Sequence, residues 1–314
     1  ALETGWLSVG GAFTELVLKP SERLRLIPGL RADLYNHGST TQWNLDPRLI
    51  ARWRVYDGEV GGTWLKAVAG RYHQPPRFFV PVPGAEQSAL GLGLLSSTQL
   101  SVGAETRLAP GVELDVQTYF NYMDPVIFDM RVNQPLSDVQ QNPPSHPPWE
   151  LPPEGSGSRS FFNDFIRKRV GRSYGVEVML RKRDTDRLFG WIAYTLSRSE
   201  RIGDTGRYEP FDFDRLHILN FVAGIRLPRN WELGGRVLLQ SGTPLTTIFG
   251  YNESRSDGQF RFDLRIDKRA VWKSWMLDFY VDIVNATVSR ESGGLVGGQP
   301  IRYIVPTIGF RAVL

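Results

Sequence analysis

Charged side chains recur at every second position in several segments of the chain. Glu113 and Asp115 are two positions apart, as are Arg52 and Arg54. Because residues i and i+2 point to the same face of a β-strand, this spacing predicts a surface that carries both signs of charge. Cross-strand ion pairs are the commoner use of such a surface, and selection of a charged solute is the alternative. The residues expected on it are Arg52, Arg54, Glu113, Asp115, Glu177, Arg181, Arg236, Arg261, Asp263, Arg265 and Asp267.

The residues that would make an enzyme do not form a recognisable constellation. No nucleophile elbow, HExxH pair or glycine-rich phosphate loop occurs, so we expect no enzyme, no catalytic residue and no cofactor. Asp212, Asp214 and Glu209 could hold calcium, but a solvated acidic loop is the commoner outcome, and no metal site is predicted. Asn285 begins a glycosylation sequon and is expected only to end a strand. The histidines, each at or near an expected loop, are His37, His73, His146 and His217.

Large aromatic side chains gather in the longer expected connections. Exposed aromatic residues can hold a ligand, but they also form the girdles of membrane proteins at the lipid interface or pack loops together. We therefore treat them as candidate ligand contacts in outer loops, with these two structural roles as alternatives. The residues are Trp43, Tyr72, Phe78, Phe79, Trp149, Phe161 and Phe162.

Composition excludes several classes of protein. The 37 Lys and Arg residues are nearly balanced by 33 Asp and Glu, and the charges are scattered, so a nucleic-acid partner is not expected. No segment approaches the roughly 18 consecutive apolar residues of a membrane-spanning helix. The sequence contains no cysteine, so it has no disulfides. A soluble β-protein and a membrane β-barrel both remain, because barrel strands need an apolar residue only at every second position.

Period-two alternation is the dominant pattern of the whole chain. Leu24, Leu26 and Leu30 alternate with Arg23, Arg25 and Arg31, and similar patterns recur to the C-terminal end. Alternation of this length predicts an all-β, antiparallel protein with about 13 strands. The expected strands are 5–18, 22–35, 47–56, 63–73, 97–108, 112–122, 172–183, 187–198, 215–227, 231–241, 260–271, 275–285 and 302–314.

The connections between these strands differ in length at the two ends. Short turns at 19–22, 109–111, 184–186, 228–230 and 272–274 alternate with longer loops, of which 123–172 is the longest and rich in proline. Outer-membrane barrels have short periplasmic turns and long extracellular loops, whereas a soluble sandwich has no such rule. The strand count is odd, and such barrels have an even number. We therefore expect further strands from elsewhere, since unpaired strand edges are costly in lipid.

Several segments of the chain resemble one family in their order. They are SSTQLSVGAETRL (96–108), VELDVQTYFNYMDPV (112–126), GRSYGVEVMLRK (171–182), GWIAYTLSRSE (190–200), FDFDRLHILN (211–220), WELGGRVLLQSGTPLT (231–246) and FRFDLRIDKR (260–269). Together they resemble the barrel of TonB-dependent receptors. The last strand, 306–314, resembles the terminal signal that the barrel assembly machinery recognises. Its matching positions are Gly309, Phe310, Ala312 and Leu314, although the family usually ends on an aromatic residue.

This resemblance implies a C-terminal part, residues 1–314, of a transmembrane barrel of roughly 22 strands. About nine strands, the plug domain and the segment that contacts TonB would then lie elsewhere. It also implies uptake of a scarce nutrient, such as a metal chelate, glycan or peptide, across the bacterial outer membrane. The implied partners are outer-membrane lipid and lipopolysaccharide, the barrel assembly machinery, TonB, and the remaining strands or a partner chain. A structural or assembly role in the envelope and an open porin-like channel are the alternatives.

The first expected strand has one residue that does not fit this pattern. By alternation, Leu7, Val9, Phe13 and Val17 face lipid, and Glu15 shares their face. A carboxylate on the lipid face costs least near the membrane interface. We therefore expect Glu15 near the periplasmic rim or beside a β-bulge.

Overall fold

The chain folds into one long, curved antiparallel sheet. A computed structural model describes residues 7–78, 87–88, 90–127, 168–183, 187–203, 206–247, 250–291 and 301–313. Most of the expected loop at 123–172 lies outside this part of the chain. No helix among the described residues is long and apolar enough to span a membrane.

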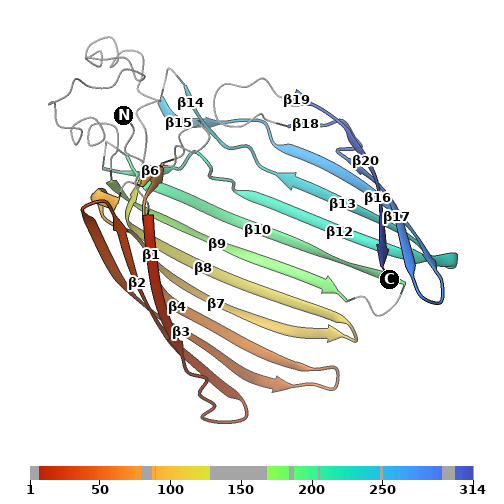
Figure 1. The fold of residues 1–314 in the computed structure, drawn as a ribbon, viewed down its shortest axis with the longest axis horizontal. Helices are drawn as coiled ribbons and strands as arrows, with labels where there is room; N and C mark the ends of the chain where they lie inside the picture. Colours follow the sequence, from red (N-terminus) through yellow and green to blue (C-terminus); the bar gives the residue numbers. More distant parts are fainter. Residues whose placement is uncertain are drawn as a thin grey trace.

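Thirteen strands follow one another across the sheet in chain order, each antiparallel to its neighbours, and β11 pairs with β10 as a fourteenth. They are β1 (Leu7–Glu15), β2 (Leu24–His37), β3 (Thr40–Asp57), β4 (Gly62–Gln74), β7 (Leu95–Ala109), β8 (Val112–Ile127), β9 (Lys168–Lys182), β10 (Leu188–Ile202), β12 (His217–Leu227), β13 (Trp231–Gln240), β16 (Gln259–Val271), β17 (Met276–Val284) and β20 (Val305–Val313). The all-β, antiparallel fold and its strand order are as predicted (Figure 1).

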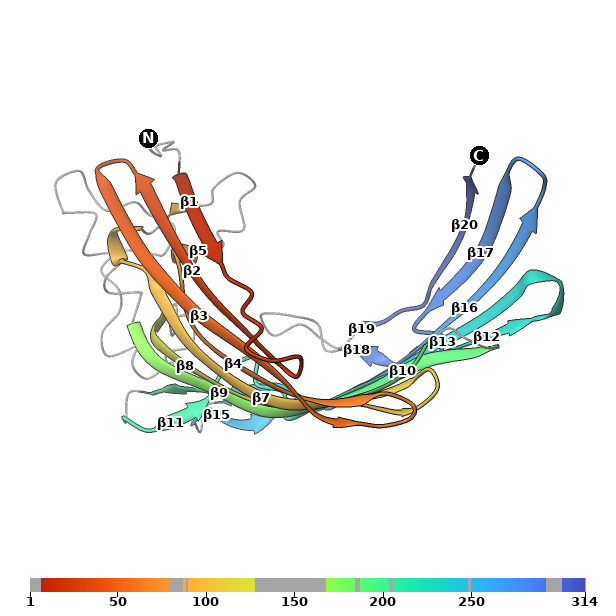
Figure 2. The same ribbon diagram turned by 90° about the horizontal axis from the view of Figure 1, so that it is seen from below.

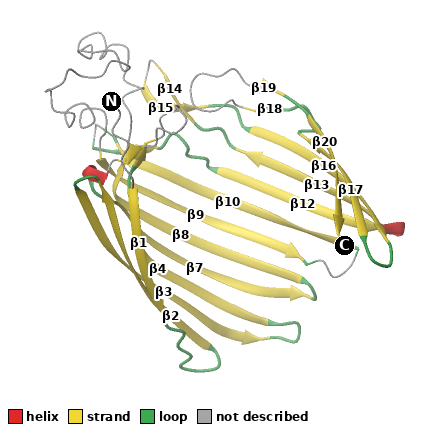
Figure 3. Ribbon diagram, viewed as in Figure 1, coloured by secondary structure: helices red, strands yellow, loops and turns green. Residues whose placement is uncertain are grey.

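The remaining elements are short and lie in the connections at one end of the sheet or in its tight turns. Figure 3 shows that strands dominate the described part of the chain. The short elements are β5 (Arg77–Phe78), β6 (Gln87–Ser88), β11 (Tyr208–Pro210), β14 (Pro244–Thr247), β15 (Gly250–Arg255), β18 (Arg290–Glu291), β19 (Ile301–Arg302), and the 3₁₀ turns η1 (Leu90–Leu92) and η3 (Pro228–Asn230).

The sheet curls into an open trough. Seen from the side in Figure 2, β1 and β20 stand on the two opposite arms of the trough. Among the described strands, β1 pairs only with β2, and β20 pairs only with β17. Curvature of this kind is what strands of a large barrel show, and the fold is consistent with part of such a barrel.

The two faces of the sheet differ in chemistry. One face carries exposed apolar side chains such as Leu49, Phe221 and Phe310. The other carries Asp33, Glu113 and most of the charged residues of the strands, several of them buried. Side chains converge on the inner side of a curved sheet and spread apart on its outer side. We therefore call the charged side the concave face and the apolar side the convex face.

The hairpin between β2 and β3 departs from the prediction. Residues 36–46 were expected to form a long loop, but β2 and β3 remain paired up to His37 and Thr40, and only Gly38 and Ser39 turn the chain. Gly38 has a φ of 58°, a backbone conformation that glycine adopts readily. The expected strict alternation of short turns with long loops is therefore wrong at this hairpin.

The register of β1 also differs from the prediction, and it resolves the difficulty with Glu15. Glu15 pairs with Gly29 and Phe13 with Arg31, so the odd-numbered residues of β1 lie on the concave face. Glu15 forms an ion pair with Arg48 there, at 2.6 Å. Phe13 shares this face and is 71% exposed. The expectation that these residues face lipid is wrong, because the pairing with β2 decides the face of an edge strand whose own pattern is weak.

Candidate functional site

The concave face is the candidate functional surface of the protein. The strand registers place all the charged residues that were expected on one face on this side of β3, β8, β9, β13 and β16. Antiparallel pairing brings them together across strands: Arg236 lies opposite Asp263, and Glu113 lies opposite Arg181. Their use in a transport pathway stays a prediction.

Glu113 is the centre of the most heavily paired group on this face. Its carboxylate accepts a hydrogen bond from Arg181 at 2.6 Å, binds Arg183, and lies 3.4 Å from Arg107. Only 9% of its side chain is exposed. Next to this group, Asp115 binds Lys66. These contacts join β7, β8 and β9 near their tight turns.

The C-terminal strands carry a second network of the same kind. Arg265 donates to Asp267 at 2.7 Å and to Asp282 at 2.8 Å. Asp278 accepts hydrogen bonds from Arg269 at 2.6 Å and Arg311 at 2.7 Å, which ties β16, β17 and β20 together.

Of the remaining expected residues of the wall, Arg54 forms a close ion pair with Asp57, and the others have longer contacts. Arg261 lies 3.2 Å from Asp263, Arg52 lies 3.3 Å from Glu105, and Arg236 donates to Asn220 at 3.2 Å. Glu177 forms no ion pair with another described residue. Most of these groups are partly exposed, so each pair contributes at most about 1 kcal/mol of stability. On this face, positive and negative side chains therefore lie next to each other and largely neutralise each other, so the face does not carry one sign of charge.

On the concave face, an aromatic ring among the charged residues packs against a glycine of the neighbouring strand. A Cβ atom added to Gly309 would lie 2.3 Å from the ring of Tyr280, on the neighbouring strand. The ring of Tyr280 in turn lies 4.3 Å below the guanidinium of Arg265, a cation–π contact. Gly309 therefore has a packing role in addition to its predicted role in the terminal assembly signal.

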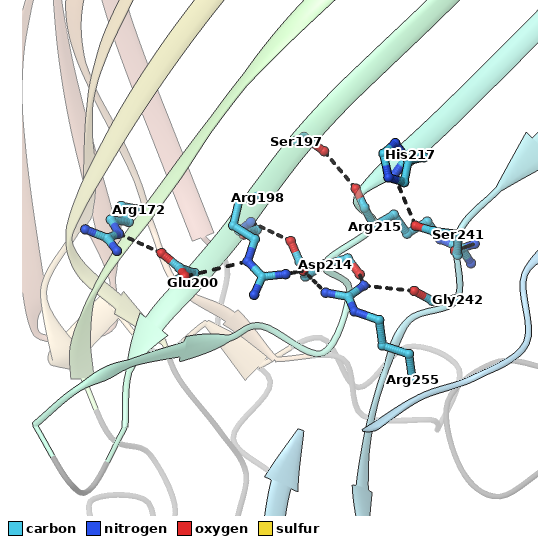
Figure 4. Close-up of polar contacts among 11 residues, drawn as sticks. Arg172, Ser197, Arg198, Glu200, Asp214, Arg215, His217, Ser241, Gly242 and Arg255 are labelled. Atoms are coloured by element: carbon cyan, nitrogen blue, oxygen red, sulfur yellow. Dashed lines mark hydrogen bonds and ion pairs between the residues drawn. The ribbon is translucent and has the colours of Figure 1, made fainter. Parts of the chain in front are cut away.

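A polar cluster holds the connections at one end of the sheet, and Figure 4 shows its contacts. Asp214, in the β10–β12 connection, has a fully buried side chain. Its carboxylate accepts hydrogen bonds from the backbone N–H of Ser199 at 2.6 Å and from Arg198 at 3.2 Å, and it also binds Arg255 of β15. The calcium role weighed for Asp214 is therefore unsupported, since two guanidinium groups and a backbone amide surround the carboxylate.

The same cluster joins two separate connections. Arg255, at the end of β15, donates to the backbone carbonyls of Asp214 and Gly242, each at 3.0 Å. Arg215 donates to the carbonyl of Ser241 at 3.3 Å, and burial lowers the pKa of its guanidinium. The β10–β12 and β13–β16 connections are thus held to each other by side-chain contacts, which sequence reasoning did not identify.

A network of aromatic and acidic groups extends the cluster toward β9. Arg172 donates to Glu200 at 2.7 Å, and its guanidinium lies 3.8 Å from the ring centre of Tyr208 in β11. Because β11 pairs with the end of β10, this contact helps to hold the β10–β12 connection against the sheet.

The aromatic residues predicted as outer-loop contacts occupy different places. Trp43 lies in β3 on the convex face and is 73% exposed, so its expected position in a loop is wrong. Tyr72 lies in β4 on the concave face, and Phe78 is the last residue of β5. Trp43 and Tyr72 therefore lie on opposite faces of the sheet. Phe79, Trp149, Phe161 and Phe162 lie outside the described residues.

Two of the predicted histidines and the sequon asparagine have structural partners, and His37 is the last residue of β2. The ring of His73 lies 2.5 Å from Asp46, and that of His217 lies 2.8 Å from the hydroxyl of Tyr194. Asn285 is fully buried, and its side chain donates to the carbonyls of Ser289 and Tyr303. Burial makes Asn285 inaccessible to a glycosyl transferase. His146 lies outside the described residues, and within them no group of acidic residues and histidines is arranged to hold a metal ion.

The terminal strand has the expected amphipathic form where it is described. Phe310 and Ile308 lie on the convex face and are 77% and 70% exposed, whereas Gly309 and Arg311 lie on the concave face. Ala312 follows Phe310 on the convex face, and Leu314 lies outside the described residues. Recognition of this strand by the assembly machinery stays a prediction.

Comparison with known proteins identifies a family and a set of similar structures. The family described as TonB dependent receptor-like, beta-barrel matches residues 6–285. The FrpB iron transporter from Neisseria meningitidis has a TM-score of 0.67 and 11% identity, with 98% of this chain and 44% of that chain covered. The ferric yersiniabactin uptake receptor FyuA from Yersinia pestis has a TM-score of 0.61 and 14% identity, with 98% and 45% covered.

A third similar structure is the ferric-catecholate import receptor Fiu from E. coli K12. It has a TM-score of 0.61 and 11% identity, with 91% of this chain and 41% of that chain covered. No curated protein matches the sequence. At these identities the structures establish the fold alone, and the chain spans less than half the length of each of them.

Proposed function

This chain belongs to the family of TonB-dependent receptor-like β-barrels of the Gram-negative outer membrane, and we propose that it forms part of the wall of a nutrient importer. The imported substrate would be a scarce nutrient, such as a metal chelate, a glycan or a peptide. Energy would come from TonB through a part of the protein outside residues 1–314, and a plug would close the lumen. The charged concave face would line the lumen, and the convex face would contact lipid.

The observation that carries this proposal is the contrast between the two faces. The convex face exposes apolar residues along the length of the sheet, as contact with lipid tails requires. The concave face carries paired charges of both signs, which suit a water-filled interior or a polar plug. The similar structures named above are described as an iron transporter and as receptors for ferric chelates, which supports import as the activity.

Uptake measurements with the full-length receptor would test the proposal. Cells that produce the receptor would be supplied with radiolabelled ferric chelates, copper or neutral oligosaccharides, in otherwise identical strains with and without TonB. We expect uptake of at least one substrate that requires both the receptor and TonB.

Planar-bilayer recordings of the purified receptor would provide an independent check. A plugged importer should conduct almost no current. A steady ohmic conductance, together with uptake that does not depend on TonB, would instead identify an open channel and overturn the proposal.

A further inference from the structure

A small cavity lies on the concave face where β4 and β8 end and β7 begins. Its volume is about 280 Å³, and its lining includes Tyr72, Gln74, Ser97, Gln99, Asn121 and Met123. The strand registers place these side chains on the concave face, on the same side as the charged wall. We propose that this cavity binds a neutral, hydroxyl-rich ligand group, such as a sugar ring of a glycan substrate. The inference rests on the proposed import function and specifies the substrate class.

The lining of the cavity combines apolar and polar side chains and carries no acidic residue, lysine or arginine. Its one histidine, His73, has its ring nitrogen 2.5 Å from Asp46. This lining contrasts with the wall around it, where Arg, Asp and Glu predominate. An anionic chelate would therefore find no guanidinium or ammonium group in the cavity, and a cation would find no carboxylate. A neutral polar ligand avoids this mismatch, since it carries no charge to be desolvated.

The polar groups of the cavity are suited to neighbouring hydroxyls. Each amide of Gln74, Gln99 and Asn121 offers both donors and an acceptor, and the hydroxyls of Tyr72 and Ser97 can do either. Asn121 donates one hydrogen bond to Ser173 at 3.2 Å, which orients its amide and leaves its oxygen available. The side chains of Tyr72, Gln74 and Gln99 make no hydrogen bond to another described residue.

Tyr72 supplies an aromatic surface in the lining of the cavity. A Cβ atom added to Gly70 would lie 2.7 Å from the Tyr72 hydroxyl oxygen and 2.9 Å from two ring carbons, so the ring lies against the backbone of Gly70. Such a ring gives the apolar C–H face of a sugar a surface to pack on. Met123 and Leu95 add apolar contact in the same cavity.

A side chain of the neighbouring strand β3 fixes the end of β4 that carries Tyr72. Pairing between β3 and β4 stops at Arg48 and Gly70. Beyond this point, Asp46 of β3 accepts a hydrogen bond from the backbone N–H of His73 at 3.2 Å and contacts its ring at 2.5 Å. The acidic side chain thus replaces the missing ladder contacts and positions Tyr72 before a ligand arrives.

Calorimetric titration of the purified full-length receptor tests this inference. The probes are neutral hexasaccharides of glucose, mannose and xylose, and ferric citrate is the anionic comparison. We expect at least one hexasaccharide to bind. Asn121→Ala and Tyr72→Ala should each weaken that binding about tenfold, the effect of losing one ligand contact.

Gln117→Ala is the matched control, because Gln117 is an amide on the same face of β8 but outside the cavity lining. It should bind like the wild type. Gln99→Leu is a second variant that removes the amide at an exposed position without reducing side-chain volume, so a folding defect is not expected. Heat-modified mobility on gels would confirm that each variant forms a barrel.

The outcomes separate this inference from the import function. If no hexasaccharide binds, or if Asn121→Ala, Gln99→Leu and Gln117→Ala all bind alike, the assignment of the cavity is overturned. TonB-dependent uptake of a chelate would survive either result. Loss of all TonB-dependent uptake, by contrast, would overturn the import function itself.

Discussion

Asp214 is the residue on which the contacts of the outer connections converge. Its carboxylate is fully buried between Arg198 and Arg255, which come from different parts of the chain. A buried charge that loses its partner is destabilised far more than an exposed one, because it cannot recover its hydration. The removal of Asp214 would leave two partly buried guanidinium groups without their common carboxylate.

We therefore predict that Asp214→Asn loosens both connections at once. The expected cost is about 3 kcal/mol of local stability, since two charged hydrogen bonds to a buried acid are lost. Hydrogen exchange measured by mass spectrometry should become faster in 206–216 and in 250–256. The control is Asp257→Asn, an exposed acid in the same β13–β16 connection. Equal exchange rates in the two variants would show that Asp214 does not join the connections.

At the scale of the strands, β3 shows how the sheet fits a membrane. Trp43 and Trp53 both lie on the convex face and are ten residues apart. At about 3.3 Å per residue and a tilt of about 40°, this separation spans about 25 Å along the membrane normal. That length equals the apolar band of an outer-membrane barrel, so the two tryptophans fit the aromatic girdles at its two interfaces.

A charge placed between these tryptophans should test the assignment of the faces. Leu49 lies on the convex face near the middle of β3, and Ile50 lies next to it on the concave face. Leu49→Arg should cost about 2–4 kcal/mol in vesicles, because a guanidinium at the membrane midplane is poorly solvated. Ile50→Arg should cost much less, since it faces the polar interior. Urea unfolding in lipid vesicles would measure both, and equal losses would refute the face assignment.

The register of β1 can be tested by cross-linking, because the natural chain has no cysteine. Ala12 lies directly opposite Ala32, and both are exposed on the convex face. The Ala12→Cys and Ala32→Cys pair should form a disulfide on mild oxidation, detected by a shift in gel mobility. The pair of Phe13→Cys with Ala32→Cys should not, since Phe13 points to the other face. The reverse result would mean that β1 has slipped by one residue.

For the molecule as a whole, the number of strands determines how the sheet can close. Thirteen antiparallel strands in order mean that β1 and β20 run in the same direction. Direct pairing of these two edges would create one parallel seam, which bacterial single-chain barrels avoid by having an even number of strands. An odd number of additional strands, about nine in a barrel of roughly 22, satisfies both edges.

We predict that a structure of the full-length receptor will show an odd number of strands between β20 and β1. Cryo-electron microscopy of the receptor in lipid nanodiscs would count them directly. An even number, or a direct contact of β1 with β20, would contradict the prediction. The charged networks of β8 and β17 should persist in that structure, because their partners all lie within the sheet described here.

Local pattern was enough to predict much of this protein. The alternation of Leu24, Leu26 and Leu30 with arginines predicted both the strand and the face that each residue occupies, because a strand repeats every two residues. The same rule placed Glu113 and Asp263 on one face. Thirteen strands were expected, and the sheet contains thirteen in chain order. The family resemblance also came from sequence, through segments that keep their order along the chain.

Tertiary structure decided the features that depend on partners distant in sequence. Glu15 turned inward because β1 follows the register of β2 and meets Arg48, and the β2–β3 ladder took Trp43 out of its expected loop. Asp214 became a buried junction only when Arg255 reached it from another connection. The neutral cavity around Tyr72 likewise needs three strands side by side. Alternation along the chain predicts which side chains share a face, whereas which face that is, and which contacts those side chains make, follow from which strands pair and in what register.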